Sequence, residues 1–185
     1  MHRNGTGSAP AVSVLVPVLE PSELTGLEAR ISELKAALAR SVASYEILVL
    51  IDGPSKVMGP VEPQPGVRTR FRAYAGGRRA VLDEGYRLSR GAVLVVVERG
   101  LDLTVDRLRT ILDPIKRGAD VVSAVDVAAD AGVLVKMVAR VRAWVRGRLD
   151  RPGGLRAYRR YALAAQLGSA HSRPASGLSV AAVTV

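Results

Sequence analysis

Short apolar runs alternate along this chain with longer segments of helical periodicity. The runs consist mainly of valine, leucine and isoleucine without alternating polar residues, as in strands buried on both faces of a parallel sheet. They predict strands at residues 12–18, 45–51, 92–97 and 120–125, and an alternating stretch predicts another at 67–74. Helical spacing predicts helices at residues 20–40, 78–89 and 105–116. Because strands alternate with helices, we expect an α/β fold with a doubly wound, mostly parallel sheet.

The C-terminal third has a different pattern. Residues 133–148 place an apolar stripe at helical spacing, flanked by lysine and arginine. The stripe consists of Leu134, Met137, Val138, Val141, Trp144 and Val145. Such a basic amphipathic helix can lie in a membrane interface, and a surface helix that packs its stripe on the sheet would have the same pattern. After a Pro-Gly-Gly turn, we expect a helix at 155–167 and a final strand at 177–185.

The size of the chain indicates a single domain. Its 185 residues fit one domain over residues 12–185, including a basic amphipathic segment at 133–160, after a disordered lead-in at 1–11. The absence of cysteine excludes a disulfide framework, thiolate zinc sites and cysteine nucleophiles. No run of 18 apolar residues is present. We therefore expect a cytoplasmic protein, with any membrane association peripheral and at the inner face.

The positive charge of the chain is unevenly placed. The formal net charge is +10, and residues 136–160 carry nine basic side chains and one acid, Asp150. A localised basic patch favours an anionic partner such as phosphate, a lipid headgroup or nucleic acid, although a solvated face of an arginine-rich chain would have the same composition. Aromatic residues make up only 4% of the chain and no nucleic-acid-binding motif is present, which argues against nucleic acid.

Candidate chemistry lies at the ends of the predicted strands, where doubly wound sheets bind ligands. Asp52 follows the strand at 45–51, and Glu98 follows the strand at 92–97. A carboxylate there can accept hydrogen bonds from a base or ribose, or ligate Mg²⁺ or Mn²⁺. Arg78 and Arg79 open a helix whose N-terminal amides favour anions. Together these residues suit a nucleoside diphosphate, and the alternative is that they serve only as caps and turns.

Several segments, taken in order, resemble the family 2 glycosyltransferases, which have the Rossmann-like GT-A fold. The similar segments are VSVLVPVLEPSELTGLEARISEL, YEILVLIDGPS, AGGRRAVLDEGYRLSRGAVLVVVERGLDL, GADVVSAVDV and DRPGGLRAYRRYAL. The last of these is similar to a segment of the dolichol- and polyprenyl-phosphate sugar synthases. The resemblance covers residues 12–163, and it implies transfer of a sugar from a nucleotide-diphosphate donor to a polyprenyl phosphate or another small acceptor.

The resemblance also implies roles for individual residues. Pro17, Glu20 and Asp52 would line the nucleoside pocket, and Arg78 and Arg79 would lie near the diphosphate. The residues that would face the acceptor phosphate are Gly154, Arg156 and Arg160. A phosphate acceptor is already an anion, so it needs positioning and charge neutralisation rather than a strong general base.

The metal-binding DxD motif of the family is altered here. It reads Glu98-Arg99-Gly100, so the second acid is replaced, and Asp102 lies two residues further on. Glu98 and Asp102 could together ligate Mg²⁺ or Mn²⁺, or Arg99 could place a fixed positive charge where the metal would lie. The simpler interpretation of Arg99 is an exposed turn residue.

Two functional interpretations therefore remain open. A transferase would use Glu98, Arg99 and Arg156 as its catalytic residues. The alternative is a catalytically inactive GT-A domain that acts as a binding or scaffold module. A homodimer is compatible with either interpretation.

Overall fold

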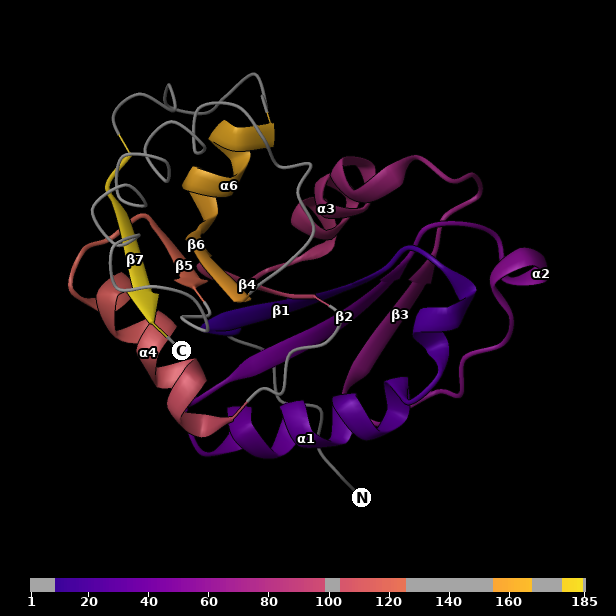
Figure 1. The fold of residues 1–185 in the computed structure, drawn as a ribbon, viewed down its shortest axis with the longest axis horizontal. Coiled ribbons are helices and arrows are strands. Elements are labelled where there is room, and N and C mark those ends of the chain that lie inside the picture. Colours follow the sequence, from indigo (N-terminus) through magenta and orange to yellow (C-terminus); the bar gives the residue numbers. More distant parts are fainter. Residues whose placement is uncertain (1–8, 99–103, 126–154, 168–177, 185) are drawn as a thin grey trace.

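The computed structural model describes residues 9–98, 104–125, 155–167 and 178–184, which form a mixed sheet with helices on both faces (Figure 1). Seven strands of this described part follow the order β3-β2-β1-β4-β6-β5-β7. The strands are β1 Val12–Val18, β2 Tyr45–Ile51, β3 Val67–Phe71, β4 Val93–Val97, β5 Val121–Val125, β6 Leu155–Arg159 and β7 Val180–Thr184. The predicted doubly wound, mostly parallel α/β fold is confirmed.

The strand directions create one reversal of strand order at the centre of the sheet. β1 pairs in parallel with β2 on one side and with β4 on the other, and β2 continues in parallel to β3. β6 lies antiparallel between β4 and β5, and β5 pairs in parallel with β7. The carboxyl ends of β1, β2 and β4 therefore meet at one edge of the sheet, which is where such folds bind ligands.

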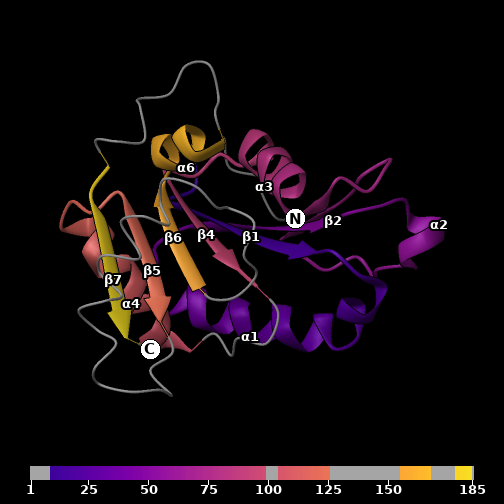
Figure 2. The ribbon, with the colours of Figure 1, turned by 45° about the horizontal axis from the view of Figure 1, so that its top comes forward.

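The helices form one layer on each face of the sheet (Figure 2). The helical elements are η1 Pro21–Leu24, α1 Leu27–Ala39, α2 Ser55–Met58, α3 Gly77–Leu88, α4 Val105–Lys116 and α6 Arg160–Leu167. The predicted helix at 20–40 is split, because the chain turns at Gly26, which has a φ of 75°. The α1/α4 layer lies on one face and the α3/α6 layer on the other.

Each face of the sheet buries its own apolar core. Val14 and Val16 of β1 pack toward α1 and α4, whereas Leu15 packs toward α3 and α6. β1 and nearly all of β2 are buried, which explains why both strands appear in the sequence as continuous apolar runs.

The predicted helix at 155–167 is partly wrong. Residues Leu155–Arg159 form strand β6, and the helix begins only at Arg160. Leu155 and Ala157 face the α1/α4 core while Tyr158 faces the α3/α6 core. This alternation suits a strand between β4 and β5, and pairing with both neighbours overrides the local helical pattern.

Other predictions on the C-terminal third are tested only in part. The final strand is confirmed as β7. Most of the predicted basic amphipathic segment at 133–160 lies outside the described residues. None of the described helices has the length and apolar character needed to cross a bilayer.

Candidate functional site

Charged side chains gather at the carboxyl edge where the strand order reverses. We name Asp52, Arg72, Arg78, Glu98 and Arg156 the switch-point cluster. Asp52 directly follows β2, Glu98 directly follows β4, and Arg78 lies in the first turn of α3. Asp52, Arg78, Glu98 and Arg156 are each between 5% and 8% exposed. Charged groups this deeply buried in a small domain need specific partners.

Asp52 binds the beginning of α3. Its carboxylate accepts hydrogen bonds from the backbone N–H groups of Gly76 at 2.9 Å and Gly77 at 2.7 Å, and from Arg72 Nη1 at 2.7 Å. Gly76 is the N-cap residue of α3 and has no side chain with which to cap the helix. The carboxylate therefore supplies the cap from a distant strand end, which is favourable because an anion complements the helix dipole.

Arg78 and Glu98 form a buried ion pair. Arg78 Nε donates a hydrogen bond to Glu98 Oε1 at 2.7 Å, and its Nη2 donates to the same oxygen. The two side chains are only 6% and 8% exposed. Two donors of one planar guanidinium fix its orientation, so Arg78 is held in place at the end of β4.

Arg156 extends the cluster across β6. It lies opposite Val96 of β4 and Ser123 of β5 in the strand register. Glu98 follows Val96 by two residues, so Arg156 and Glu98 are diagonal neighbours on the same face. The Ser123 hydroxyl is buried and has no hydrogen-bond partner among the described residues. The positions of Arg156 and Ser123 make this face polar beyond the end of the α3/α6 core.

The remaining predicted nucleotide-binding residues occupy different surroundings. Pro17 is buried near the end of β1, opposite Leu50, whereas Glu20 is exposed at the start of η1. Arg79 is exposed and donates to the carbonyl oxygen of Leu167 at 3.0 Å, which joins α3 to α6. The structure therefore brings Asp52, Arg78 and Glu98 to one edge and directs Arg79 toward another helix. The predicted residues Arg99, Gly100, Asp102 and Gly154 lie outside the described residues.

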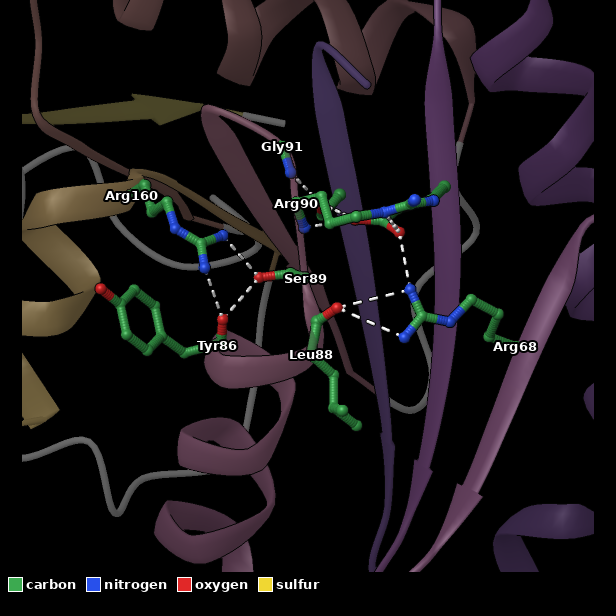
Figure 3. A network of polar contacts seen from close by, with 9 residues as sticks. Arg68, Tyr86, Leu88, Ser89, Arg90, Gly91 and Arg160 are labelled. Carbon is green, nitrogen blue, oxygen red and sulfur yellow. Dashed lines mark hydrogen bonds and ion pairs between the residues drawn. The ribbon is translucent and has the colours of Figure 1, made fainter. Parts of the chain in front are cut away.

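Arg160 lies at the opposite edge of the sheet from the switch-point cluster, because β6 runs antiparallel to β4 and ends where β4 begins. Figure 3 shows Arg160 beside Tyr86 and Ser89 at the end of α3. It donates to the carbonyl oxygen of Tyr86 at 2.9 Å and to Ser89 Oγ at 3.0 Å. Its guanidinium also lies 4.7 Å from the centroid of the Tyr86 ring, a cation–π contact. Arg160 thus joins α6 to the end of α3, and it does not share an edge with Arg156 as the resemblance implied.

Another buried carboxylate, Glu46, lies at this opposite edge, which is the amino edge where β1, β2 and β4 begin. It accepts hydrogen bonds from Ser13 Oγ and from the backbone N–H of Arg90, both at 2.6 Å, and pairs with Arg68 at 3.1 Å. Burial raises the pKa of Glu46, but the hydrogen bonds from Ser13 and Arg90 and the charges of Arg90 and Arg68 outweigh it, so the net pKa lies below the ordinary value. These contacts fix the turn between α3 and β4.

Asp120 plays a similar structural part at the beginning of β5. Tyr161 donates to its carboxylate, and Ser179 donates from its backbone N–H at 2.8 Å. Burial raises the pKa of Asp120, whereas the bonds from Tyr161 and Ser179 and the charge of Arg159 lower it to a net value below the ordinary one. The contacts hold the start of β7 against β5, and they suggest no ligand.

The sequence analysis missed Arg72 and its partner Glu84. Arg72 bonds Asp52 and also donates to Glu84 Oε2 at 3.2 Å, while Arg70 donates to Glu84 Oε1 at 2.9 Å. The sequence does contain a pattern that indicates such pairs, because arginines occupy every second position of the predicted strand at 67–74: Arg68, Arg70 and Arg72. Arginines at a period of two lie on one face of a strand and can pair with acids above it.

The described residues do not fit a divalent cation. They contain no group of three or more histidine, aspartate and glutamate side chains that could hold a metal ion. The carboxylate of Glu98 is already bound by a guanidinium, whose charge would repel a cation at the same oxygens. Asp52 is similarly engaged by Arg72 and two backbone amides. A metal site built on Glu98 would require Arg78 to move away.

Comparison with known proteins identifies solved structures that share this fold. The sequence matches no protein-family model and no curated protein. Among solved structures, it is similar to mannosyl-3-phosphoglycerate synthase from Rubrobacter xylanophilus, with a TM-score of 0.61 and 15% identity over 95% of this chain and 66% of that one. It is also similar to glucosyl-3-phosphoglycerate synthase from Mycobacterium tuberculosis, in complex with Mn²⁺, UDP-glucose and phosphoglyceric acid, with a TM-score of 0.59 and 16% identity over 95% and 70%.

A third similar structure is that of a protein named for a different activity. It is 4-diphosphocytidyl-2C-methyl-D-erythritol synthase from Anaerococcus prevotii, with a TM-score of 0.59 and 9% identity over 96% of this chain and 90% of that one. At such identities the likeness establishes the fold alone. This chain has the GT-A fold that nucleotide-sugar transferases share, as the resemblance predicted.

Proposed function

We propose that this protein is a sugar transferase that binds a nucleoside diphosphate sugar at the switch-point cluster. One observation carries the proposal: a buried guanidinium, that of Arg78, is fixed at the carboxyl edge of a GT-A sheet at its reversal of strand order. A diphosphate is recognised best by fixed, charged donors at such an edge. The neighbouring structure that holds UDP-glucose supports the same class of donor.

The donor would lie along the carboxyl ends of β1, β2 and β4. Its nucleoside would occupy the edge beside Pro17, Glu20 and Asp52. Because Asp52 also bonds Gly76 and Gly77, it would act mainly by fixing the beginning of α3 and thereby the position of Arg78. The diphosphate would lie beside the Arg78 guanidinium, with Arg79 further along the helix.

The reaction would be a displacement at the anomeric carbon of the sugar. An oxygen of the acceptor phosphate forms a bond to that carbon, the bond to the diphosphate oxygen breaks, and its electron pair leaves with the nucleoside diphosphate. Arg78 would stabilise the charge on the leaving diphosphate, and Arg156 would position the acceptor phosphate. A phosphate oxygen needs no deprotonation at neutral pH, so the site requires no histidine base.

The proposed acceptor is a polyprenyl phosphate or a small phosphorylated molecule. A polyprenyl acceptor would place the protein at the inner face of a membrane, where the basic segment at 133–160 would meet anionic headgroups. A small phosphorylated acceptor would require no membrane and would match the phosphoglyceric acid in the neighbouring structure. Assays with both acceptors distinguish these sources of the phosphate.

A second candidate function is that of a ligand-binding module without transferase activity. The observation in its favour is that Glu98 is held by Arg78 rather than presented toward a ligand. Such a module would bind the nucleotide and release it unchanged. Binding and transfer therefore have to be measured separately.

Titration calorimetry with UDP, GDP, CDP and their sugars tests the first step. We expect micromolar binding of one nucleotide, followed by transfer of its labelled sugar to polyprenyl phosphate or 3-phosphoglycerate. Arg156→Gln should lower transfer at least about tenfold, since a charged hydrogen bond contributes about 1.5–3 kcal/mol. Arg109→Gln, an exposed arginine of α4 on the other face, is the matched control. Binding without transfer would favour the module, and no binding by folded protein would contradict both functions.

A further inference from the structure

We propose that the protein binds its nucleoside diphosphate without a divalent cation, because the guanidinium of Arg78 occupies the place of the ion. The inference rests on the proposed function, and it concerns how that site neutralises the charge of its ligand. The Mycobacterium tuberculosis structure in complex with UDP-glucose also holds Mn²⁺. The described side chains of the switch-point cluster are arranged differently from what a cation needs.

The first argument is the position of the ion pair. Glu98 follows β4, where the resemblance places the first acid of the metal-binding motif. Arg78 Nε lies 2.7 Å from Glu98 Oε1, and its Nη2 bonds the same oxygen. A cation that ligated this carboxylate would lie next to a positive charge in a buried site, where water screens the repulsion poorly.

The second argument is that Arg78 is anchored. Its side chain is 6% exposed, and the helix turn that carries it is fixed by the bonds from Gly76 and Gly77 to Asp52. Arginine stays protonated in proteins. The guanidinium is therefore a permanent charge with a fixed direction, which is what a resident metal ion would otherwise supply.

The third argument is the chemistry of the donors. A guanidinium has five N–H donors in one plane and matches phosphate oxygens bidentately. Arg156, the second buried guanidinium of the cluster, lies on the same face and diagonal to Glu98. Two such groups beside one carboxylate suit an anion with several oxygens, whereas a cation site needs an excess of carboxylate oxygens.

The experiment compares binding with and without metal. Protein freed of metal is titrated with the nucleoside diphosphate that binds best, once in EDTA and once in Mn²⁺. We expect the two dissociation constants to lie within about threefold of each other, because Arg78 supplies the positive charge in both buffers. Binding that is more than tenfold tighter in Mn²⁺ would overturn the inference alone. Absence of binding in both buffers would overturn the proposed function and the inference with it.

Glu98→Gln gives a second readout with opposite expectations. Whatever the change in affinity itself, we expect the dissociation constants of Glu98→Gln in EDTA and in Mn²⁺ to stay within about threefold of each other, as in wild type. A metal-ligand role for Glu98 predicts instead that this variant loses Mn²⁺-dependent binding.

Arg78→Gln should weaken binding at least about tenfold in both buffers, because it removes charged hydrogen bonds. Arg87→Gln, an exposed arginine of the same helix, is the matched control and should bind as wild type does. Thermal unfolding checks that each variant is folded. If Arg78→Gln does not fold, the comparison of wild type in EDTA and in Mn²⁺ still shows whether binding depends on the cation. Unchanged binding by folded Arg78→Gln would overturn the inference.

Discussion

A single carboxylate, that of Asp52, joins three parts of the chain at the carboxyl edge of the sheet. It follows β2, binds Arg72 after β3, and caps α3 through Gly76 and Gly77. The position of Asp52 directly after a predicted strand indicated a functional carboxylate, but it did not indicate which groups this carboxylate binds. Those partners lie 20 to 25 residues further along the chain and are brought together only by the pairing of β2 with β3.

Replacing this carboxylate should weaken the whole fold. We expect Asp52→Asn to lower the free energy of unfolding by about 2 kcal/mol, because hydrogen bonds to a charged group contribute about 1.5–3 kcal/mol. Urea denaturation measures the change. Asp113→Asn, whose carboxylate forms an exposed pair with Lys116 at 3.4 Å, is the control and should cost at most about 0.5 kcal/mol. Equal losses in the two variants would show that the cap contributes nothing.

Glu46 makes stability depend on pH. Its net pKa is lowered in the folded protein, so its stabilising contribution is present above the unfolded pKa of about 4.3 and is lost as the pH falls through the lower folded pKa. We expect the stability of wild type to fall more steeply with acid below that pH than the stability of Glu46→Gln. Denaturation curves measured from pH 6 to pH 3 check this.

The control for that series is Glu33→Gln, which removes one acidic side chain from the exposed face of α1. If Glu46→Gln and wild type lose stability in parallel as the pH falls, the network around Glu46 does not stabilise the charged carboxylate.

At the scale of elements, close approach of backbones fixes the turn from α3 into β4. A Cβ added to Gly91 would lie 2.6 Å from the backbone nitrogen of Ser13. The backbone N–H of Gly91 also donates a hydrogen bond to Ser13 Oγ at 2.8 Å. At Gly85 an added Cβ would meet side-chain ends instead, with Leu50 Cδ1 at 2.4 Å. A backbone atom cannot move aside to relieve such a contact as easily as the end of a leucine side chain can.

We therefore expect Gly91→Ala to be the more destabilising of two glycine substitutions. It should cost about 3 kcal/mol or more, at the upper end of the range for overpacking. Gly85→Ala should cost less, because leucine side chains can shift and because alanine favours the helix by about 1 kcal/mol. Thermal and urea unfolding rank the two variants. The reverse order would contradict the close contact between Gly91 and β1.

The elements also show where sequence patterns reach their limit. β1 and β2 were predicted to the residue because both faces of each strand are buried, which leaves a continuous apolar run. The residues of β6 were predicted as the beginning of a helix at 155–167. Only its place between β4 and β5 shows that Arg156 and Tyr158 face one layer. That strand then separates Arg156 from Arg160, which the family resemblance had grouped together.

At the scale of the whole molecule, the order of segments was informative although each motif is modest. The order of strands and helices predicted a doubly wound α/β fold, and the resemblance of the segments to family 2 glycosyltransferases implied the GT-A fold. The sheet order and the similar structures confirm both. The chemistry at its edge was less predictable. Whether Glu98 faces a metal or an arginine depends on how α3 packs over β1 and β2, which brings Arg78 to the end of β4. No local pattern encodes that placement.

The central claim is that a nucleoside diphosphate binds at the switch-point cluster of this GT-A sheet. A crystal structure of the protein grown in EDTA with its tightest-binding nucleoside diphosphate tests that claim most directly. We predict a phosphate oxygen within hydrogen-bond distance of the Arg78 guanidinium and the base beside Pro17. A nucleotide bound elsewhere, for example at the amino edge near Gly91, would contradict the account.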